Sequence, residues 1–326
     1  MTAFDDAGQT PAWQLLGIQQ TLISAHLIVL TRLIRRSAQA DYTGLEPENW
    51  IDRRIILTLF RLRESSVSAL ANSLGNDLAQ VSRSLKSLSK RNFLERDQAR
   101  GPYRLSEEGR GLGSELDQLA LLRDQELVQS FTPSEMFELG GMIASLCARA
   151  MDILAEEAAI SKATADVEQW RSHGIEIYNR IIPAIFSLSN FIARGAGLAI
   201  KRLTSLSQYE WRILAFIFSR PGITFLEIMR FTDSDKAQLS RTLDTLTQAG
   251  LLIRTATGRG KQVSFETSPA ARAVHQIMQE DALRRNEALL VDLNGDQPNQ
   301  LRAYLMRLIS TAETMTNSPR YPFNTK

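Results

Sequence analysis

The sequence contains two similar segments, and this repeat constrains the possible folds more than any other feature. The first covers residues 77–88 and the second covers residues 235–246, which lie 158 positions later. Both contain the run Gln-Val/Leu-Ser-Arg-Ser/Thr-Leu, which begins at Gln80 and again at Gln238. The same offset pairs Arg54 with Arg212 without a gap. A constant offset of this kind predicts two structural units of one geometry within the chain.

Each segment has the pattern of a short amphipathic helix. At about 100° per residue, one face of the first copy is expected to be apolar and contains Leu78, Val81, Leu85 and Leu88. The opposite, polar face contains Ala79, Gln80, Arg83, Lys86, Ser87 and Lys90. A small, polar, arginine-bearing outer face is typical of a DNA-recognition helix. An ordinary surface helix has the same pattern, but its recurrence with matching flanks favours recognition.

The ends of both helices carry matching signals. Asp77 and Asp235 stand where an N-cap belongs, because an aspartate there accepts hydrogen bonds from unpaired backbone N–H groups. Asn92 and Gly250 are expected to end the helices, since these residue types best tolerate the left-handed conformation of a helix C-terminus.

Helical periodicity and turn residues predict the same order of elements around both copies. In the first half, helices are expected from Thr10 or Pro11 to Arg36 and over 49–61, 66–74, 106–129 and 132–158, with a loop at 38–47. Strands at 93–96 and 103–105 predict a small hairpin, the wing of a winged helix. In the second half, the predicted helices are 176–202 (bent at Pro183 and 195–197), 208–219, 224–231, 269–291 and 299–314. Strands at 251–254 and 262–266 flank a longer wing at 255–261.

Composition limits the class of protein. A length of 326 residues fits two domains, and a net charge of +2 means that any DNA-binding surface must come from local clustering of charge. The single cysteine excludes an internal disulfide framework. The first residues lack the pattern of a signal peptide, and no apolar run approaches the roughly 18 residues of a membrane span. We therefore expect a cytoplasmic protein with no membrane partner.

The order of a long helix, a helix, a helix-turn-helix, a wing and two long helices resembles the MarR (multiple-antibiotic-resistance regulator) family of winged helix-turn-helix transcription regulators. The residues that carry this resemblance in the second half are 207–214, 235–241, 246–251 and 268–272. In the first half they are 77–83 and 105–110. The resemblance covers residues 12–157 and 176–315 and presents a tandem of two MarR-like copies.

Members of this family form homodimers through their first and last helices, which places two winged helices on one DNA face. The resemblance therefore implies a mainly α fold with small β wings, in which two winged helix-turn-helix domains and long dimerisation-type helices form an intramolecular pseudo-dimer. The expected boundaries are 1–158 for the first domain, 159–175 for a linker, 176–316 for the second domain and 317–326 for a loose tail. Two recognition helices about 34–36 Å apart would enter successive major grooves. A homodimer of two such chains is the alternative assembly.

The partner implied by these features is double-stranded DNA, and the expected output is repression. The predicted DNA-binding residues are Gln80, Ser82, Arg83, Lys86, Ser87, Lys90, Arg100, Gln238, Ser240, Arg241, Thr245, Arg259 and Lys261. Lysine and arginine at such places mainly neutralise phosphate, whereas glutamine and arginine suit adenine and guanine edges. Each wing arginine is alternatively a solvated surface charge.

The resemblance also implies a small aromatic carboxylate effector that releases DNA. The candidate ligand-binding residues are Trp50, Arg53, Trp211 and Arg212, which place an aromatic wall beside a guanidinium in each half. The alternative interpretation is that Trp211 only fills the core.

Other chemistry has little support in the sequence. The three histidines lack metal-ligand spacing, and no catalytic motif is present, so neither an enzyme nor a metal or cofactor is expected. Cys147 is interpreted as a buried apolar residue, with a redox switch as the alternative. The competing function is a degenerate winged-helix protein that acts as a protein-interaction adaptor without reading DNA. The low net charge and Asp244 keep this alternative open.

Overall fold

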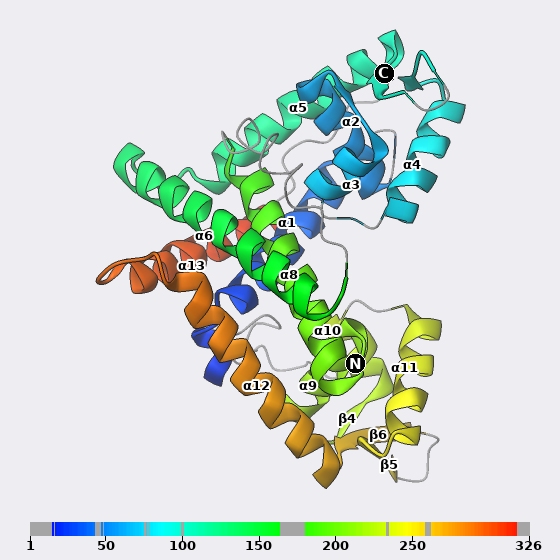
Figure 1. Ribbon diagram of the computed structural model, residues 1–326, viewed down its shortest axis with the longest axis vertical. Helices are drawn as coiled ribbons and strands as arrows, with labels where there is room; N and C mark the ends of the chain where they lie inside the picture. Colours follow the sequence, from blue (N-terminus) through cyan, green and yellow to red (C-terminus); the bar gives the residue numbers. More distant parts are fainter. Residues whose placement is uncertain are drawn as a thin grey trace, which may run out of the picture. The chain divides into compact units, whose positions relative to one another are not determined.

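The computed structural model describes Leu15, Pro47, Asn76 and residues 17–42, 49–74, 78–98, 101–163, 180–232, 235–257 and 262–317 (Figure 1). Several expected features lie outside these residues. They are the start of the first helix, the N-cap Asp77, most of the linker 159–175, the tail 318–326 and the wing residues Arg100, Arg259 and Lys261.

The first half has the expected order of elements. A short 3-10 helix, Gly17–Gln20, precedes α1 (Ile23–Asp41), α2 (Trp50–Leu62), β1 (Glu64–Ser65), α3 (Val67–Leu74) and α4 (Leu78–Lys90). The wing strands β2 (Leu94–Glu95) and β3 (Tyr103–Leu105) then lead into the long helices α5 (Glu107–Leu127) and α6 (Pro133–Ile160).

The second half contains the same order. Its elements are α8 (Ile181–Thr204), α9 (Gln208–Ser219), β4 (Ile223–Thr224), α10 (Phe225–Thr232), α11 (Lys236–Gln248), β5 (Leu252–Thr257), β6 (Gln262–Thr267), α12 (Pro269–Leu290) and α13 (Gln297–Asn317). Two antiparallel three-stranded sheets have matching orders, β1-β3-β2 and β4-β6-β5. Leu94 pairs with Leu105 but Leu252 pairs with Thr267, so the second hairpin is longer by four residues.

The predicted helix ends are confirmed where the structure describes them. The Asp235 side chain accepts a hydrogen bond from the backbone N–H of Gln238 at 2.9 Å. Gly250 has a φ of +71° and Asn92 a φ of +61°, the left-handed conformation expected at both C-termini. The predicted start of the helix at residue 132 is confirmed by a capping box in α6, in which Thr132 and Glu135 each accept from the other's backbone N–H.

Four local predictions were wrong. The first helix was expected to be continuous to Arg36, but residues 17–20 form a 3-10 helix and α1 begins only at Ile23. The loop expected from residue 38 starts later, because α1 continues to Asp41 and buries Ala38. The helix α8 is continuous through 195–197, and Pro183 lies in its first turn, where its missing N–H has no intrahelical partner to lose. Strand β5 extends to Thr257, which places residues 255–257 in the ladder rather than in the wing tip.

The described chain divides into two compact units. One is built on residues 195–287 and contains the second winged helix, with a core that includes Ile213, Leu243 and Phe265. The other is built on residues 19–194 and 288–317 and contains the first winged helix, with Ile55, Leu85 and Leu116 in its core, together with long helices. The boundaries expected from the sequence remain a prediction.

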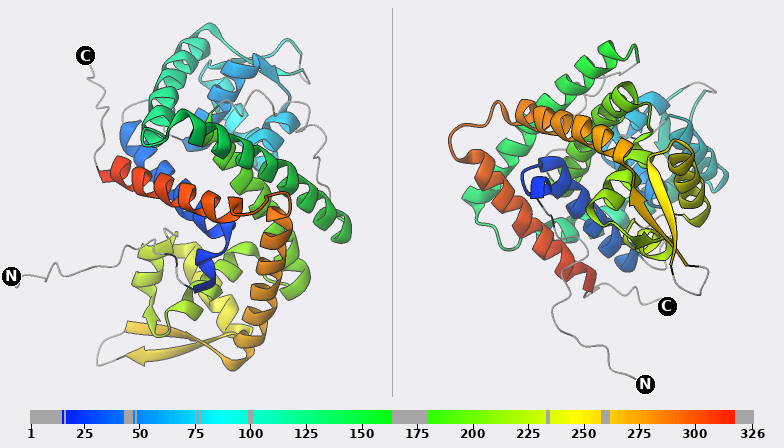
Figure 2. Two further views of the ribbon diagram at one scale, coloured as in Figure 1. Left: turned by 90° about the vertical axis from the view of Figure 1, so that its left-hand side faces the viewer. Right: turned by 90° about the horizontal axis from the view of Figure 1, so that it is seen from below.

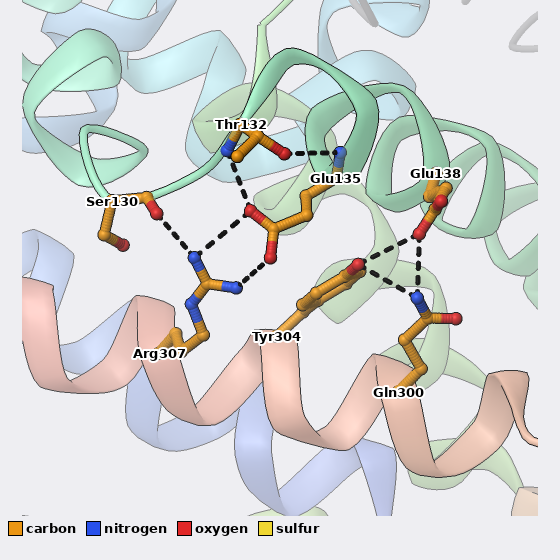
Figure 3. Close-up of polar contacts among 7 residues, drawn as sticks. All are labelled: Ser130, Thr132, Glu135, Glu138, Gln300, Tyr304 and Arg307. Carbon is orange, nitrogen blue, oxygen red and sulfur yellow. Dashed lines mark hydrogen bonds and ion pairs between the residues drawn. The ribbon is translucent and has the colours of Figure 1, made fainter.

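Within the larger unit, the last described helix packs on helices of the first half. Helix α13 contacts α1, α5 and α6 (Figure 2). Figure 3 shows a polar cluster at the contact of α6 and α13. Arg307 donates to the carboxylate of Glu135 at 2.5 Å, and the Tyr304 hydroxyl donates to Glu138 at 2.9 Å. These contacts join residues that are more than 160 positions apart in the sequence.

One described helix, α8, is long and apolar enough by length and composition to cross a membrane. Three of its apolar side chains, Ile185, Phe186 and Leu188, are buried against the protein, as in the core helix of a soluble fold. The sequence of α8 contains no long uninterrupted apolar run, because Ser187, Ser189 and Asn190 break it.

Candidate nucleic-acid interface and effector pocket

The outer face of α4 forms the first part of the candidate interface. Its underside is closed by Val81, Leu85 and Leu88, which are fully buried. Arg83, Lys86, Ser87 and Lys90 are exposed, while Gln80 and Ser82 are partly exposed. The predicted division of the helix is therefore confirmed, with one exception. Leu78, the first residue of the helix, is 54% exposed.

A buried carboxyl group joins α4 to the helix beneath it. Asp52 of α2 is 5% exposed and interacts with the hydroxyl of Ser84, which is itself buried on α4. Burial raises the pKa of Asp52, and the hydrogen bond to Ser84 opposes this shift. A second contact precedes the helix, where Asn76 donates to the side chain of Gln80 at 3.2 Å. Neither role was predicted from the sequence, since both depend on how α2, α3 and α4 pack.

The outer face of α11 forms the equivalent part in the second half. Leu239, Leu243 and Leu246 are fully buried beneath it. The predicted residues Gln238, Ser240, Arg241 and Thr245 are all exposed. The helix is followed by the longer hairpin β5–β6, seen beside α11 in Figure 1.

The two halves differ in how the recognition-type helix meets its wing. Asp244 of α11 forms an ion pair with Arg254 of β5 at 2.9 Å, and the guanidinium of Arg254 also lies over the ring of Phe265. The position equivalent to Asp244 in α4 is occupied by Lys86.

In the first half, the wing arginine that corresponds to Arg254 is Arg96. It lies over the ring of Tyr103, with 4.9 Å between Cζ and the ring centroid. The neighbouring Arg104 forms an ion pair with Asp97. Among the described residues, no acidic partner pairs with Arg96 or Lys86.

A cavity of about 100 Å³ lies inside the larger compact unit, between the first winged helix and long helices. Trp50 and Arg53, two of the four candidate ligand-binding residues, both line it. Tyr42, which directly follows α1, also lines it, and Phe186 of α8 packs against Trp50 with 5.4 Å between the ring centroids. The predicted pairing of an aromatic wall with a guanidinium is therefore present in this half.

Several arginines concentrate positive charge at this cavity. Arg61 and Arg180 share the carboxylate of Asp117, and Arg123 pairs with Asp41. Arg54 donates to the carbonyl of Leu74 at 3.0 Å and lies over Phe186, and no acidic side chain in the described chain pairs with it. Burial, with a smaller contribution from the charge of Arg35, lowers the pKa of Arg54 to about 10, so its guanidinium stays charged at neutral pH.

The cavity also offers a buried donor. The indole N–H of Trp50 has no hydrogen-bond acceptor within the part of the chain that the structure describes. Sequence reasoning missed Arg54, Tyr42 and Phe186 at this site. The signal for Arg54 was its place beside Arg53, but Phe186 comes from α8, and only the tertiary contact of α8 with α2 brings it to the cavity.

The remaining two candidate residues lie in the smaller unit. Trp211 packs against His275 with 5.8 Å between ring centroids, and His275 stacks on Phe218 at 3.6 Å. Arg212 lies over the ring of Tyr209 at 5.0 Å. Burial lowers the pKa of His275. The aromatic contacts of Trp211 fit the alternative interpretation of a packing role.

Cys147 is fully buried, with its Sγ 3.9 Å from the carbonyl of Ala184, as expected for a core cysteine.

The described residues contain no group of three or more histidine, cysteine, aspartate or glutamate side chains arranged to hold a metal ion.

Comparison with known proteins supports the winged-helix assignment for part of the chain. The model of the MarR family matches residues 203–262, which run from the end of α8 to the start of β6. A search of curated proteins gave no match. The family match suggests a transcription regulator that binds DNA.

Three solved structures resemble parts of the chain. A crystal structure of MarR is 22% identical and covers 36% of this chain and 88% of its own, with a TM-score of 0.34. A MarR protein from Peptoclostridium difficile is 18% identical, and the match covers 47% of this chain and 93% of that protein, with a TM-score of 0.35. A probable transcriptional regulator from Pseudomonas aeruginosa is 25% identical, and the match covers 36% of this chain and 94% of that protein, with a TM-score of 0.29.

Proposed function

We propose that this protein is a sequence-specific, double-stranded-DNA-binding transcription regulator that acts as a repressor. The observation that carries the proposal is the presence of two helix-turn-helix segments, each with a buried apolar underside and an exposed outer face. Arg83 and Arg241 occupy equivalent exposed positions on these faces, beside Gln80 and Gln238. Such faces suit a major groove, where arginine and glutamine side chains reach base edges and phosphates.

We further propose that the two halves act as a pseudo-dimer within one chain. The support is the repeated order of elements and the packing of α13 on α1 and α6, which joins the end of the chain to its first half. In this arrangement each helix-turn-helix contacts its own half-site. Because α4 and α11 carry different side chains, the operator need not be palindromic.

DNA titrations at several salt concentrations test this function. The purified chain is first used to select its site from random-sequence duplexes. Binding to that duplex is expected to weaken steeply with salt, with a slope of log K against log salt of about −0.9 for each phosphate contact. Arg83→Ala and Arg241→Ala should each weaken specific binding by about 1–3 kcal/mol if the side chain reads a base.

A matched control is Arg36→Ala, which removes one exposed positive charge from α1, outside both helix-turn-helix segments. This variant should bind DNA as the parent protein does. If the parent shows no salt-dependent binding to any duplex, the regulator proposal is wrong and the adaptor interpretation gains support.

The cavity at Trp50 supports a small aromatic anion as the effector. The Trp50 indole N–H is a donor in need of an acceptor, and Arg54 supplies a charge that no described carboxylate neutralises. The rings of Trp50, Tyr42 and Phe186 supply apolar walls. An aromatic carboxylate satisfies all three features. Since the walls come from α1, α2, α5 and α8, a ligand here can change how the first winged helix packs on these helices.

Calorimetric titration with benzoate tests the effector. Benzamide, which lacks the charge, and cyclohexanecarboxylate, whose ring is not aromatic, are the matched ligands. Arg54→Gln and Trp50→Leu should each weaken benzoate binding at least tenfold, because a charge-assisted hydrogen bond or a ring contact is lost. Trp211→Leu is the control in the second half. Equal binding of benzoate and benzamide would contradict an anion site, and benzoate binding that leaves DNA affinity unchanged would contradict the role in release.

A further inference from the structure

The charge on the outer face differs between the two recognition-type helices. Helix α4 carries Arg83, Lys86 and Lys90 and no acidic residue. Helix α11 carries Lys236 and Arg241 together with Asp244. The formal charges of the helices are therefore +3 and +1.

The acidic residue of α11, Asp244, also forms an ion pair with the nearest wing arginine. Asp244 and Arg254 form an ion pair at 2.9 Å, with side chains that are 48% and 42% exposed. Phe265 beneath the guanidinium holds Arg254 in place. A phosphate that approaches Arg254 must compete with a carboxylate that is already in contact, and it must also approach the negative charge of Asp244.

No such pair is present among the described residues of the first half. Arg96 takes the position of Arg254 and lies over Tyr103, which takes the position of Phe265. The residue that corresponds to Asp244 is Lys86, an exposed cation on the outer face of α4. The wing arginine and the helix therefore present positive charge together on this side.

We propose that the two winged helices bind DNA unequally, with α4 and Arg96 making more phosphate contacts than α11 and Arg254. Helix α11, whose Asp244 engages Arg254, contributes mainly base contacts through Gln238 and Arg241. This inference rests on the proposed DNA-binding function. Its physical basis is that each phosphate neutralised by a lysine or arginine releases condensed counterions, whereas an arginine already paired with a carboxylate releases fewer.

The test is the salt dependence of binding by the full chain to its selected duplex. Lys86→Ala and Arg96→Ala should each reduce the magnitude of the slope by about 0.9. Lys86→Asp recreates in the first half the charge pattern of the second, and it should reduce the slope by about 2, because a cation is lost and Arg96 gains a carboxylate partner. Arg254→Ala should leave the slope unchanged even if the affinity falls through a less ordered wing.

The reciprocal change is Asp244→Lys, which should increase the magnitude of the slope by about 2. Thermal unfolding of every variant, followed by circular dichroism, shows whether the fold is intact. Arg36→Ala again serves as the charge-matched control. Equal losses of slope for Arg96→Ala and Arg254→Ala would overturn the unequal division while leaving DNA binding established. A parent protein without salt-dependent binding would overturn both this inference and the proposed function.

Discussion

The long helix that follows each wing illustrates how the two halves differ. In the first half, Arg123 of α5 reaches a different helix, α1: it pairs with Asp41, and it donates to Ser37 at 2.7 Å and to the carbonyl of Ile34 at 3.0 Å. In the second half, Arg285 of α12 has the equivalent place after the longer wing, but it pairs with Asp281 of its own helix at 2.7 Å.

This difference agrees with the division into compact units. The first winged helix shares a unit with α1 and other long helices, and its buried ion pair is one of the interactions that join them. The second winged helix satisfies the equivalent charge locally. Two segments with the same order of elements can therefore be tied to their surroundings to different degrees, through substitutions at a few buried positions.

Replacing Arg123 and its equivalent Arg285 should give the largest difference in stability between the two halves. Arg123→Met leaves the carboxylate of Asp41 buried without its cation, and the side chains of the pair are 3% and 5% exposed. The expected loss in free energy of unfolding is about 3–5 kcal/mol. Arg285→Met should cost only about 1 kcal/mol, because Asp281 keeps its contact with Arg284. Urea unfolding followed by circular dichroism measures both, and equal losses would contradict the comparison.

A smaller effect is expected at the start of the same two helices. Gly109 of α5 lies so close to the wing that an added Cβ would be 2.1 Å from the carbonyl oxygen of Phe93. The equivalent position in α12 is Ala271, which is fully buried without such a conflict. Gly109→Ala should therefore destabilise the protein by about 1–3 kcal/mol, because the backbone must move.

The control for this substitution is Gly140→Ala. Gly140 lies within α6, and an added Cβ there meets no atom within 4 Å. Alanine should stabilise the helix at this position by about 0.5–1 kcal/mol, since glycine has the larger conformational entropy in the unfolded chain. Thermal unfolding shows whether each variant gains or loses stability. If Gly109→Ala stabilised the protein, the close approach of Gly109 to Phe93 would be wrong.

The smallest predicted effect on stability appears only at acid pH. It distinguishes the N-terminus of α6 from the N-terminus of α13. The side-chain hydrogen bond from Arg307, aided by the backbone of Thr132, lowers the pKa of Glu135 to about 2 from its ordinary value of 4.5. A carboxyl group whose pKa is lower in the folded state stabilises the protein above the unfolded value, and this contribution is lost as the pH falls from about 4.5 towards 2. Glu135→Gln should flatten the pH dependence of unfolding in that window.

The start of α13 supplies the matched control. There the backbone N–H of Asn294 donates to the neutral side chain of Gln297 at 2.8 Å. Gln297→Ala should lower stability by a similar amount at every pH between 2 and 5, because no group titrates. Acid unfolding curves that change shape in this variant as well would show that the pH dependence does not come from Glu135.

Much of the candidate interface could be predicted from the sequence, because it depends on local patterns. The exposure of Arg83 and Lys86 follows from helical periodicity over buried leucines, and the start of α11 follows from a single aspartate before it. The effector pocket was predicted only in part. Trp50 and Arg53 were found, but neither Tyr42 nor Phe186 had a local signal that would place it at the cavity.

The sequence by itself determined the elements, their order, their caps and the polar outer faces of α4 and α11. All of these depend on residues a few positions apart, whose hydrogen bonds and periodicity are fixed within one helix or hairpin. Only the tertiary structure decided that Arg123 pairs with Asp41, which is 82 residues away, and that α1, α2, α5 and α8 enclose one cavity. Such contacts depend on which apolar faces pack together, and helical periodicity identifies a buried face without identifying its partner.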